Sequence, residues 1–293
     1  MRRCLLATTL ASACGTEATD APRCARPEHV TLTTLPSVIA EASGIGIGGS
    51  AAEVLWLHND GDDGRLFAVS PTGILLATVV LPTGSVVDAE DLALEVFDDG
   101  REVAWLADIG DNDLSRPEVA IVRVPLPSLV GQAPGTVIAG EPQRFRLRYP
   151  DRPRNAEALV LDPGGDVFVI VKAQRDASET EVFRARQPLS PDAIRTLEPA
   201  GTIVAQGPVT GAALQDDVLA VRTTLSALYG PWSPAFDGTT ACAVTLPDAA
   251  TESGEAIAWR PDGRGLVVTH EGVGAVVSEL IAADDAFGEW PPP

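Results

Sequence analysis

Short runs of alternating apolar and polar residues, separated by turn residues, make up most of the chain. The stretch 89–112 shows the pattern clearly, because apolar residues alternate on both sides of an Asp-Asp-Gly turn at 98–100. A period of two is typical of a half-buried β-strand, and Asp-Gly favours a tight hairpin turn. We predict an antiparallel hairpin here, with its acidic ends, Glu90 and Asp108, at one edge of the sheet.

The same pattern recurs along the sequence, and no stretch has the periodicity of an amphipathic helix. We therefore predict an all-β protein with strands at 30–35, 42–47, 54–58, 66–69, 74–81, 92–97, 103–108, 119–125, 143–149, 158–161, 167–172, 181–186, 201–205, 218–223, 226–229, 242–246, 256–259, 266–270 and 275–281, and with one more from 212.

The strands fall into five sets that open on similar motifs. The motifs are EASGI, EDLA, NAEAL, TGAAL and GEAI, beginning at residues 41, 90, 155, 210 and 254. They lie roughly 40 to 70 residues apart, the spacing of four-stranded propeller blades. The last set is one strand short, and strand 30–35 supplies it. The sequence thus predicts a five-bladed β-propeller closed by its N-terminal strand, or six blades if the long interval 90–157 contains another.

The first residues resemble a bacterial export signal. Arg2 and Arg3 precede a short apolar stretch at 4–13, and LASAC ends on Cys14 as in a lipobox. We expect a signal peptide at 1–13, a tether at 14–28 after a lipidated Cys14, and a single propeller domain at 29–293. Plain secretion and an uncleaved tail are the alternatives.

Cys24 and Cys242 are the only cysteines beyond this leader. In an oxidising compartment such a pair most economically forms one disulfide. Two separate buried thiols remain the alternative.

Composition narrows the classes of partner. The net charge of −20 argues against nucleic-acid binding and favours cations or cationic partners. No apolar run is long enough for a membrane-spanning helix. We expect an exported monomer, lipid-anchored to the cell envelope or secreted, which meets the membrane only through its lipid.

Charged residues recur at the starts of the inner strands and at the ends of their neighbours, which places them at one mouth of the propeller axis. We predict a metal site formed by Glu41, Glu90, Asp108, Glu157 and Glu255, with Ala212 breaking the set in the fourth blade. The candidate ligand-binding residues are His58, Asn59, Asp111, Asn112, Lys172, Arg222, His270 and Glu271. For the glutamates the alternative is a structural role at blade junctions, for the histidines packing or capping, and for Lys172 and Arg222 salt bridges to the glutamates.

Clustered carboxylates are commonly relieved by a hard cation, and an irregular oxygen site favours Ca²⁺ over Mg²⁺. The loop DGDDG at 60–64 resembles a calcium loop but has Pro71 at its twelfth position, so we interpret it as a hairpin turn. GIGIGG at 44–49 precedes a strand and not a helix, which excludes a nucleotide site. The motifs G-x-S-x-G, H-E-x-x-H, the P-loop and paired C-x-x-C do not occur.

Together, EASGI, LWLHNDG, DAEDLAL, ADIGDN, RYPDRPRNAEAL, VTGAAL and GEAIAWRPDGRG resemble a family of exported bacterial propellers, related in pattern to phytase-like esterase and calcium-binding propeller proteins. The resemblance spans essentially the whole mature chain, and ADIGDN and NAEAL are its most specific parts. It implies an extracytoplasmic propeller with a divalent-cation site.

Two interpretations of function follow. In the first, a Ca²⁺-occupied acidic mouth binds a small-molecule ligand or a cell-envelope partner without chemistry. In the second, the cation polarises a phosphate or carboxylic ester for hydrolysis, while Lys172, Arg222 and His270 stabilise negative charge.

Overall fold

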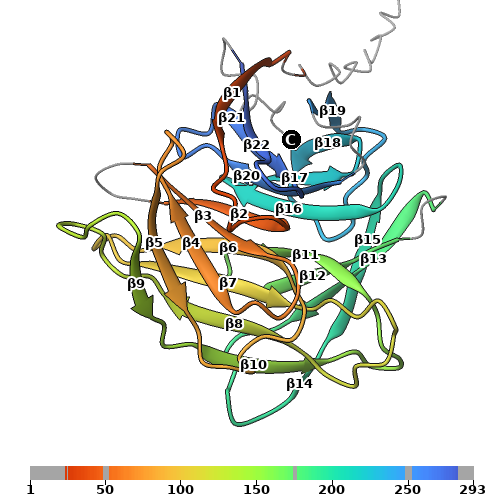
Figure 1. Ribbon diagram of the computed structural model, residues 1–293. Helices are drawn as coiled ribbons and strands as arrows, with labels where there is room; N and C mark the ends of the chain where they lie inside the picture. The colour runs from red at the N-terminus through yellow and green to blue at the C-terminus, as the bar shows by residue number, and fades with distance from the viewer. Residues whose placement is uncertain (1–23, 25, 49–52, 174–176, 248–252, 283–293) are drawn as a thin grey trace, which may run out of the picture.

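The computed structural model describes residues 24, 26–48, 53–173, 177–247 and 253–282. Every regular element in this part is a β-strand, and the strands form five sheets arranged around one axis (Figure 1). No helix among the described residues is long and apolar enough to cross a membrane. The all-β class and the five-bladed propeller are therefore confirmed.

Each blade runs outward from its inner strand. Blade 1 contains β2 (Ala42–Gly48), β3 (Val54–Asn59), β4 (Arg65–Val69) and β5 (Leu75–Val80). Blade 2 contains β6 (Ala89–Val96), β7 (Glu102–Asp108), β8 (Val119–Pro125) and β10 (Gln143–Arg148). Blade 3 contains β11 (Ala156–Leu161), β12 (Val167–Val171), β13 (Glu179–Ala185) and β15 (Glu198–Val204). Blade 4 contains β16 (Val209–Gln215), β17 (Val218–Thr223), β18 (Ser226–Pro231) and β19 (Cys242–Thr245). Blade 5 contains β20 (Gly254–Trp259), β21 (Gly265–His270) and β22 (Val276–Ile281).

The outer strand of blade 5 comes from the other end of the chain. β1 (Glu28–Thr34) pairs antiparallel with β22, from Glu28 opposite Ile281 to Thr34 opposite Val276. This confirms that the N-terminal strand closes the ring. The first and last blades are thereby held by backbone hydrogen bonds between residues more than 200 positions apart.

The long interval 90–157 does not hold a sixth blade. It holds β9 (Thr136–Ala139), which pairs parallel with β5 and so extends blade 1 to five strands. β14 (Arg195–Thr196) extends blade 2 in the same way by pairing with β10. Alternation alone does not indicate these short strands, because they add to sheet edges and bury little side-chain surface.

Apolar side chains fill the space between neighbouring blades. One buried cluster brings Trp56 and Leu66 of blade 1 against Leu106 and Val122 of blade 2. Trp56 is 1% exposed. Leu66 is completely buried, and burying a leucine side chain stabilises the fold by about 1.5 to 3 kcal/mol. The blades are therefore held together mainly by their facing apolar surfaces.

Every inner strand carries a bulge at the same place. The pairing of the inner strand with the second strand skips one residue near the start of each blade, and the skipped residues are Ser43, Glu90, Glu157, Thr210 and Glu255. A bulged residue has no partner across the ladder, so its side chain is re-aimed from the sheet. The structure thus corrects the predicted register: the equivalents of Glu90 in blades 1 and 4 are Ser43 and Thr210, not Glu41 and Ala212.

The two hydroxyl residues at these bulges connect blades. Ser43 Oγ donates a hydrogen bond to the Glu90 carbonyl at 2.6 Å, and Thr210 Oγ1 donates to the Gly254 carbonyl at 2.8 Å. Glycine follows each of them. A Cβ at Gly211 would lie 2.6 Å from the Glu255 carbonyl oxygen. The small residues in EASGI and VTGAAL therefore allow the next blade to approach closely.

The buried carboxylate of Asp91 also connects blades through hydrogen bonds. Its Oδ2 accepts hydrogen bonds from Leu159 N at 2.8 Å and Ala212 N at 3.4 Å, so one side chain of blade 2 contacts blades 3 and 4. Its Oδ1 accepts from Leu92 N at 2.8 Å. Burial raises the pKa of Asp91 to about 7, against the opposing effect of these N–H groups.

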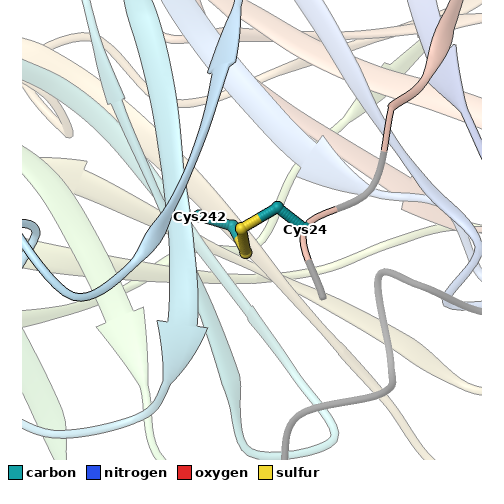
Figure 2. The surroundings of a disulfide bond; sticks show 2 residues. All are labelled: Cys24 and Cys242. Carbon is teal, nitrogen blue, oxygen red and sulfur yellow. A yellow bond between two sulfur atoms is a disulfide. The ribbon is translucent and has the colours of Figure 1, made fainter. Parts of the chain in front are cut away.

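Cys24 and Cys242 form a disulfide, the pairing predicted from the sequence (Figure 2). Cys242 lies in β19, the outer strand of blade 4, whereas Cys24 lies just before β1, the outer strand of blade 5. The bond therefore links the outer edges of two neighbouring blades across 218 residues of sequence.

Loss of this disulfide is expected to destabilise the propeller. Replacing both cysteines, in Cys24→Ser/Cys242→Ser, should lower the free energy of unfolding by ~2 to 5 kcal/mol, because a long loop is released in the unfolded chain. The melting temperature should fall by about 5 to 15 °C in differential scanning calorimetry. Cys14→Ser is the matched control and should melt like the wild type. Equal melting of the wild type with and without reductant would contradict the prediction.

Candidate metal centre at the axial mouth

The inner strands begin at one end of the propeller axis, which we call the axial mouth. Two sets of residues reach it. The first is the bulge positions, of which Glu90, Glu157 and Glu255 are acidic. The other set lies just after the second strand of a blade and contains Asp60, Lys172 and Glu271. The backbone N–H of each donates a hydrogen bond to the carbonyl oxygen of the residue just before the inner strand of the same blade. The blade repeat therefore supplies charged side chains at repeated positions.

Asp60, Asp88 and Glu90 form the tightest cluster in the part of the chain that the structure describes. One carboxylate oxygen from each lies within 4.8 Å of the other two. We call these three residues the axial triad. Asp60 and Asp88 are not among the predicted metal ligands. Asp60 could have been found from its alignment with Lys172 and Glu271 in the repeat, and Asp88 from its position immediately before an inner strand.

A glycine of the ADIGDN motif leaves room for the triad. A Cβ at Gly110 would collide with Glu90 Oε1 and with the Asp88 carboxylate. Gly110 N also donates a hydrogen bond to the Asp88 carbonyl at 3.1 Å. The backbone at Gly110 therefore packs directly against the carboxylates of Glu90 and Asp88, which any side chain at this position would displace.

The carboxylates of the axial mouth are short of hydrogen-bond partners. Asp60 Oδ1 and Glu255 Oε2 are buried and have no hydrogen-bond partner. Glu90 is 3% exposed. An unpaired buried carboxylate is costly in its charged form. The site therefore favours either bound protons or a bound cation.

Protonation is favoured in the absence of a cation. Burial, followed by the nearby charges of Glu157, Asp60 and Asp88, raises the pKa of Glu90. Burial also raises the pKa of Glu157, although Lys172 opposes the shift. Burial and the charge of Glu157 raise the pKa of Glu255 to about 8.

Lys172, the only lysine of the chain, lies among these groups. Its Nζ is 3.1 Å from Glu157 Oε2. Burial lowers its pKa, but the charges of Glu157, Glu255 and Glu90 outweigh burial and raise the pKa overall. Lys172 is thus a fixed positive charge that neutralises one of several carboxylates, as the salt-bridge interpretation predicts.

Asp108, predicted as a metal ligand, forms ion pairs with two arginines instead. Its side chain is completely buried, and its oxygens form ion pairs with Arg116, at 2.8 Å, and with Arg144. Asp108 Oδ1 also accepts a hydrogen bond from Asp88 N at 2.8 Å. We correct its role: Asp108 supports the backbone that carries Asp88 and does not belong to the axial triad.

Asp111 and Asn112 also position the mouth. The Asp111 carboxylate accepts hydrogen bonds from Ser115 N and Arg116 N, which fixes the loop after β7. Asn155 then joins the two most specific motifs, ADIGDN and NAEAL. It accepts from Asp111 N at 2.7 Å and donates to Asn112 Oδ1 at 3.1 Å and to Glu157 Oε1 at 3.0 Å.

The two histidines predicted as ligand-binding residues make local contacts. His58 is 1% exposed, its Nδ1 lies 2.8 Å from the Asn59 carbonyl oxygen, and burial lowers its pKa to about 4. His270 Nδ1 lies 2.7 Å from the Glu271 carbonyl oxygen, and its Nε2 accepts a hydrogen bond from Val276 N at 3.4 Å. These contacts fit the packing and capping roles that the sequence left open.

Of the remaining predicted residues, some hold the backbone through hydrogen bonds and others lie at the axial mouth. Asn59 holds the loop after β3, because its side chain donates to the Val38 carbonyl and accepts from Glu41 N. Arg222 is completely buried and donates to the Ala256 carbonyl at 2.9 Å. Glu41 is exposed at the rim of the mouth. The pKa of Glu271 is raised by burial and by the charges of Asp60 and Glu41.

Beyond the bulges, the inner strands line a small cavity on the same axis. It has a volume of about 150 Å³ and is lined by the inner strands of all five blades, with Ile45, Leu92, Leu159 and Ile257 among its residues. Among the described residues, no charged side chain lines this cavity, so the charged groups described above lie at the axial mouth.

Comparison with known proteins supports the fold. No protein-family model matches the sequence, and no curated protein matches it. Among solved structures, a glucose dehydrogenase aligns with TM-score 0.51 and 11% identity over 88% of this chain and 100% of that one. The major Malassezia sympodialis allergen Mala s 1 aligns with TM-score 0.51 and 12% identity over 91% and 98%. At these identities the similarity concerns the fold alone.

The pKa shifts predict how stability depends on pH in the absence of metal. For Glu255 the folded-state pKa of about 8 exceeds the ordinary value of 4.5, so between these values the folded state holds a proton that the unfolded state releases. Glu90 shifts in the same direction. In EDTA, stability should therefore be highest near pH 5 and fall as the pH rises through 8.

Glu90→Gln removes one of these protonation sites while keeping its shape. In urea unfolding at pH 5, 7 and 9 in EDTA, the loss of stability with rising pH should be smaller in this variant than in the wild type. Glu141→Gln, at an exposed position outside the mouth, should behave like the wild type. A wild-type stability that rises between pH 5 and 9 would contradict the assigned shifts.

Proposed function

We propose that the protein is an extracytoplasmic binding propeller whose axial mouth holds a divalent cation, with Ca²⁺ as the ion. The observation that carries this proposal is the axial triad, in which three carboxylate oxygens lie within 4.8 Å of one another. Calcium ligands lie about 2.3 to 2.6 Å from the ion. Two of them on opposite sides of one ion are therefore separated by about 5 Å at most, which the triad satisfies.

Charge supports the same proposal. Glu157, Glu255 and Glu271 add negative charge around the triad, whereas Lys172 supplies one positive charge that Glu157 already engages. A cation would replace the protons that burial otherwise retains. It would also satisfy the buried oxygen of Asp60.

The irregular arrangement favours Ca²⁺ over Mg²⁺. Asp60 follows a strand, Asp88 lies in a loop and Glu90 lies at a bulge, so the three ligands come from unlike backbone positions. Ca²⁺ accepts 6 to 8 oxygens in flexible geometry, whereas Mg²⁺ requires a near-octahedral shell. Carboxylate oxygens from neighbouring blades and water would complete the larger shell.

The bound cation gives the mouth its ligand preference. With the ion in place, Lys172 and the cation would present positive charge inside a negative rim that includes Glu41. We propose that this combination binds a small molecule or cell-envelope partner that offers an oxygen anion to the cation. A monomer suffices for such a site, because one chain supplies every residue of the triad.

Ester hydrolysis is the alternative, and the side chains assigned to it have other contacts. His270 uses both ring nitrogens in backbone contacts, and Arg222 is completely buried. Lys172 alone retains a position at the mouth. These observations favour binding without chemistry.

Calcium should stabilise the wild type. A ligand that binds only the folded state stabilises it by about 2.7 kcal/mol at ~100 times its dissociation constant. The melting temperature should then rise by about 5 to 10 °C with Ca²⁺, less with Mg²⁺, and return to its starting value with EDTA.

Variants of the triad test which carboxylates are responsible. Glu90→Gln and Asp60→Asn should lose the Ca²⁺ response and keep the β-rich circular dichroism spectrum, whereas Glu141→Gln should keep the response. Elemental analysis and isothermal titration calorimetry measure the ion directly. A wild type that binds no Ca²⁺ would mean that protons and Lys172 neutralise the mouth, and would overturn the proposal.

Export and lipid anchoring are a separate part of the proposal. They rest on Arg2, Arg3 and the LASAC motif ending on Cys14, all of which lie outside the described residues. In a bacterial host, the wild type should fractionate with membranes and incorporate labelled palmitate, whereas Cys14→Ser should not incorporate the label. Cys4→Ser is the control. A wild type that remains in the cytoplasm, or a label retained by Cys14→Ser, would contradict this assignment.

A further inference from the structure

An insertion between β8 and β10 departs from the blade repeat. The chain leaves blade 2 after Pro125, adds β9 to the edge of blade 1, and returns to blade 2 at Gln143. In Figure 1, β9 lies outside β5. This insertion accounts for the unusually long interval between the second and third blade motifs. Ring closure does not require it, because the other blades close without one.

The insertion forms one wall of a pocket. The pocket has a volume of about 430 Å³ and lies between Trp56 and Leu76 of blade 1 and Leu126, Leu129 and Val130 of the insertion. Pockets of this size hold drug-sized ligands, and an apolar lining with few polar groups is typical of them. The structure therefore contains a second concave site besides the axial mouth.

The pocket opens at the other end of the blades from the axial mouth. Its rim includes the 99–102 segment, which joins the end of β6 to β7, whereas Glu90 lies at the start of β6. Asp99 and Arg101 pair with each other at 2.7 Å at this rim. Asp99 and Arg101 neutralise each other, and Glu102 is the remaining charged residue of the lining, so the pocket disfavours an anionic ligand.

One apolar side chain of the pocket is left uncovered. Val130 is 82% exposed, although its neighbours Leu126 and Leu129 pack against the core. An apolar molecule in the pocket would cover this valine.

We infer that this pocket binds a small, uncharged, mainly apolar molecule. The inference does not depend on the axial cation, because the two sites share no residue. The insertion is then a binding element, since it supplies the apolar wall that the repeat lacks.

Nile red, an uncharged apolar dye, is a suitable probe for this pocket. We expect saturable binding with one site per chain, detected as a blue-shifted rise in dye fluorescence, with the same affinity in Ca²⁺ and in EDTA. Val130→Asp should weaken binding about tenfold, because a charged carboxylate replaces apolar contact surface. The exposure of Val130 means that the variant should fold like the wild type.

Val137→Asp is the matched control, because Val137 is 70% exposed on β9 and does not line the pocket. It should bind the dye like the wild type. Binding that does not saturate, equal weakening by both variants, or an unchanged affinity in Val130→Asp would overturn the inference. Loss of dye binding in EDTA would assign the dye to the axial mouth and would overturn it as well.

Discussion

The one-residue bulge at the start of every inner strand is the constraint on which the site depends. It frees one side chain per blade from the sheet ladder at the same height on the axis. In blades 1 and 4 that side chain is a hydroxyl that bonds the next blade, and in blades 2, 3 and 5 it is a glutamate. The same backbone device therefore connects blades where the residue is small and places charge where it is acidic.

Placing carboxylates on a narrow axis opposes folding, and the surrounding contacts offset that cost in particular ways. Gly110 gives Glu90 and Asp88 space, and Asp108 with its two arginines fixes the backbone that carries Asp88. Lys172 neutralises Glu157. These contacts leave one buried oxygen of Asp60 and one of Glu255 without a hydrogen-bond partner. Such oxygens can bind a cation or a proton. Structural support and binding capacity thus come from neighbouring positions of the same motifs.

The two ends of the propeller carry different kinds of site, because repeated blade positions form one and a single insertion forms the other. At the axial mouth, repeated positions of several blades contribute charged side chains, and the triad depends on how blades 1 and 2 meet. At the other end, the pocket beside β9 is formed by an insertion that belongs to blade 2 alone and reaches blade 1. Changes in that insertion can therefore alter the pocket without disturbing the axis.

The sequence by itself determined the fold, because alternation and recurring motifs are local signals of strands and blades, and it also indicated ring closure and the pairing of Cys24 with Cys242. It indicated an acidic mouth as well. Only the tertiary structure decided which carboxylates meet. In blades 1 and 4 the bulge lies two residues away from the predicted position, at Ser43 and Thr210 in place of Glu41 and Ala212. The arginines that bind Asp108 are not recognisable as its partners from spacing. Asp60 and Asp88 join Glu90 because loops from two blades converge in space, a relation that no local pattern records.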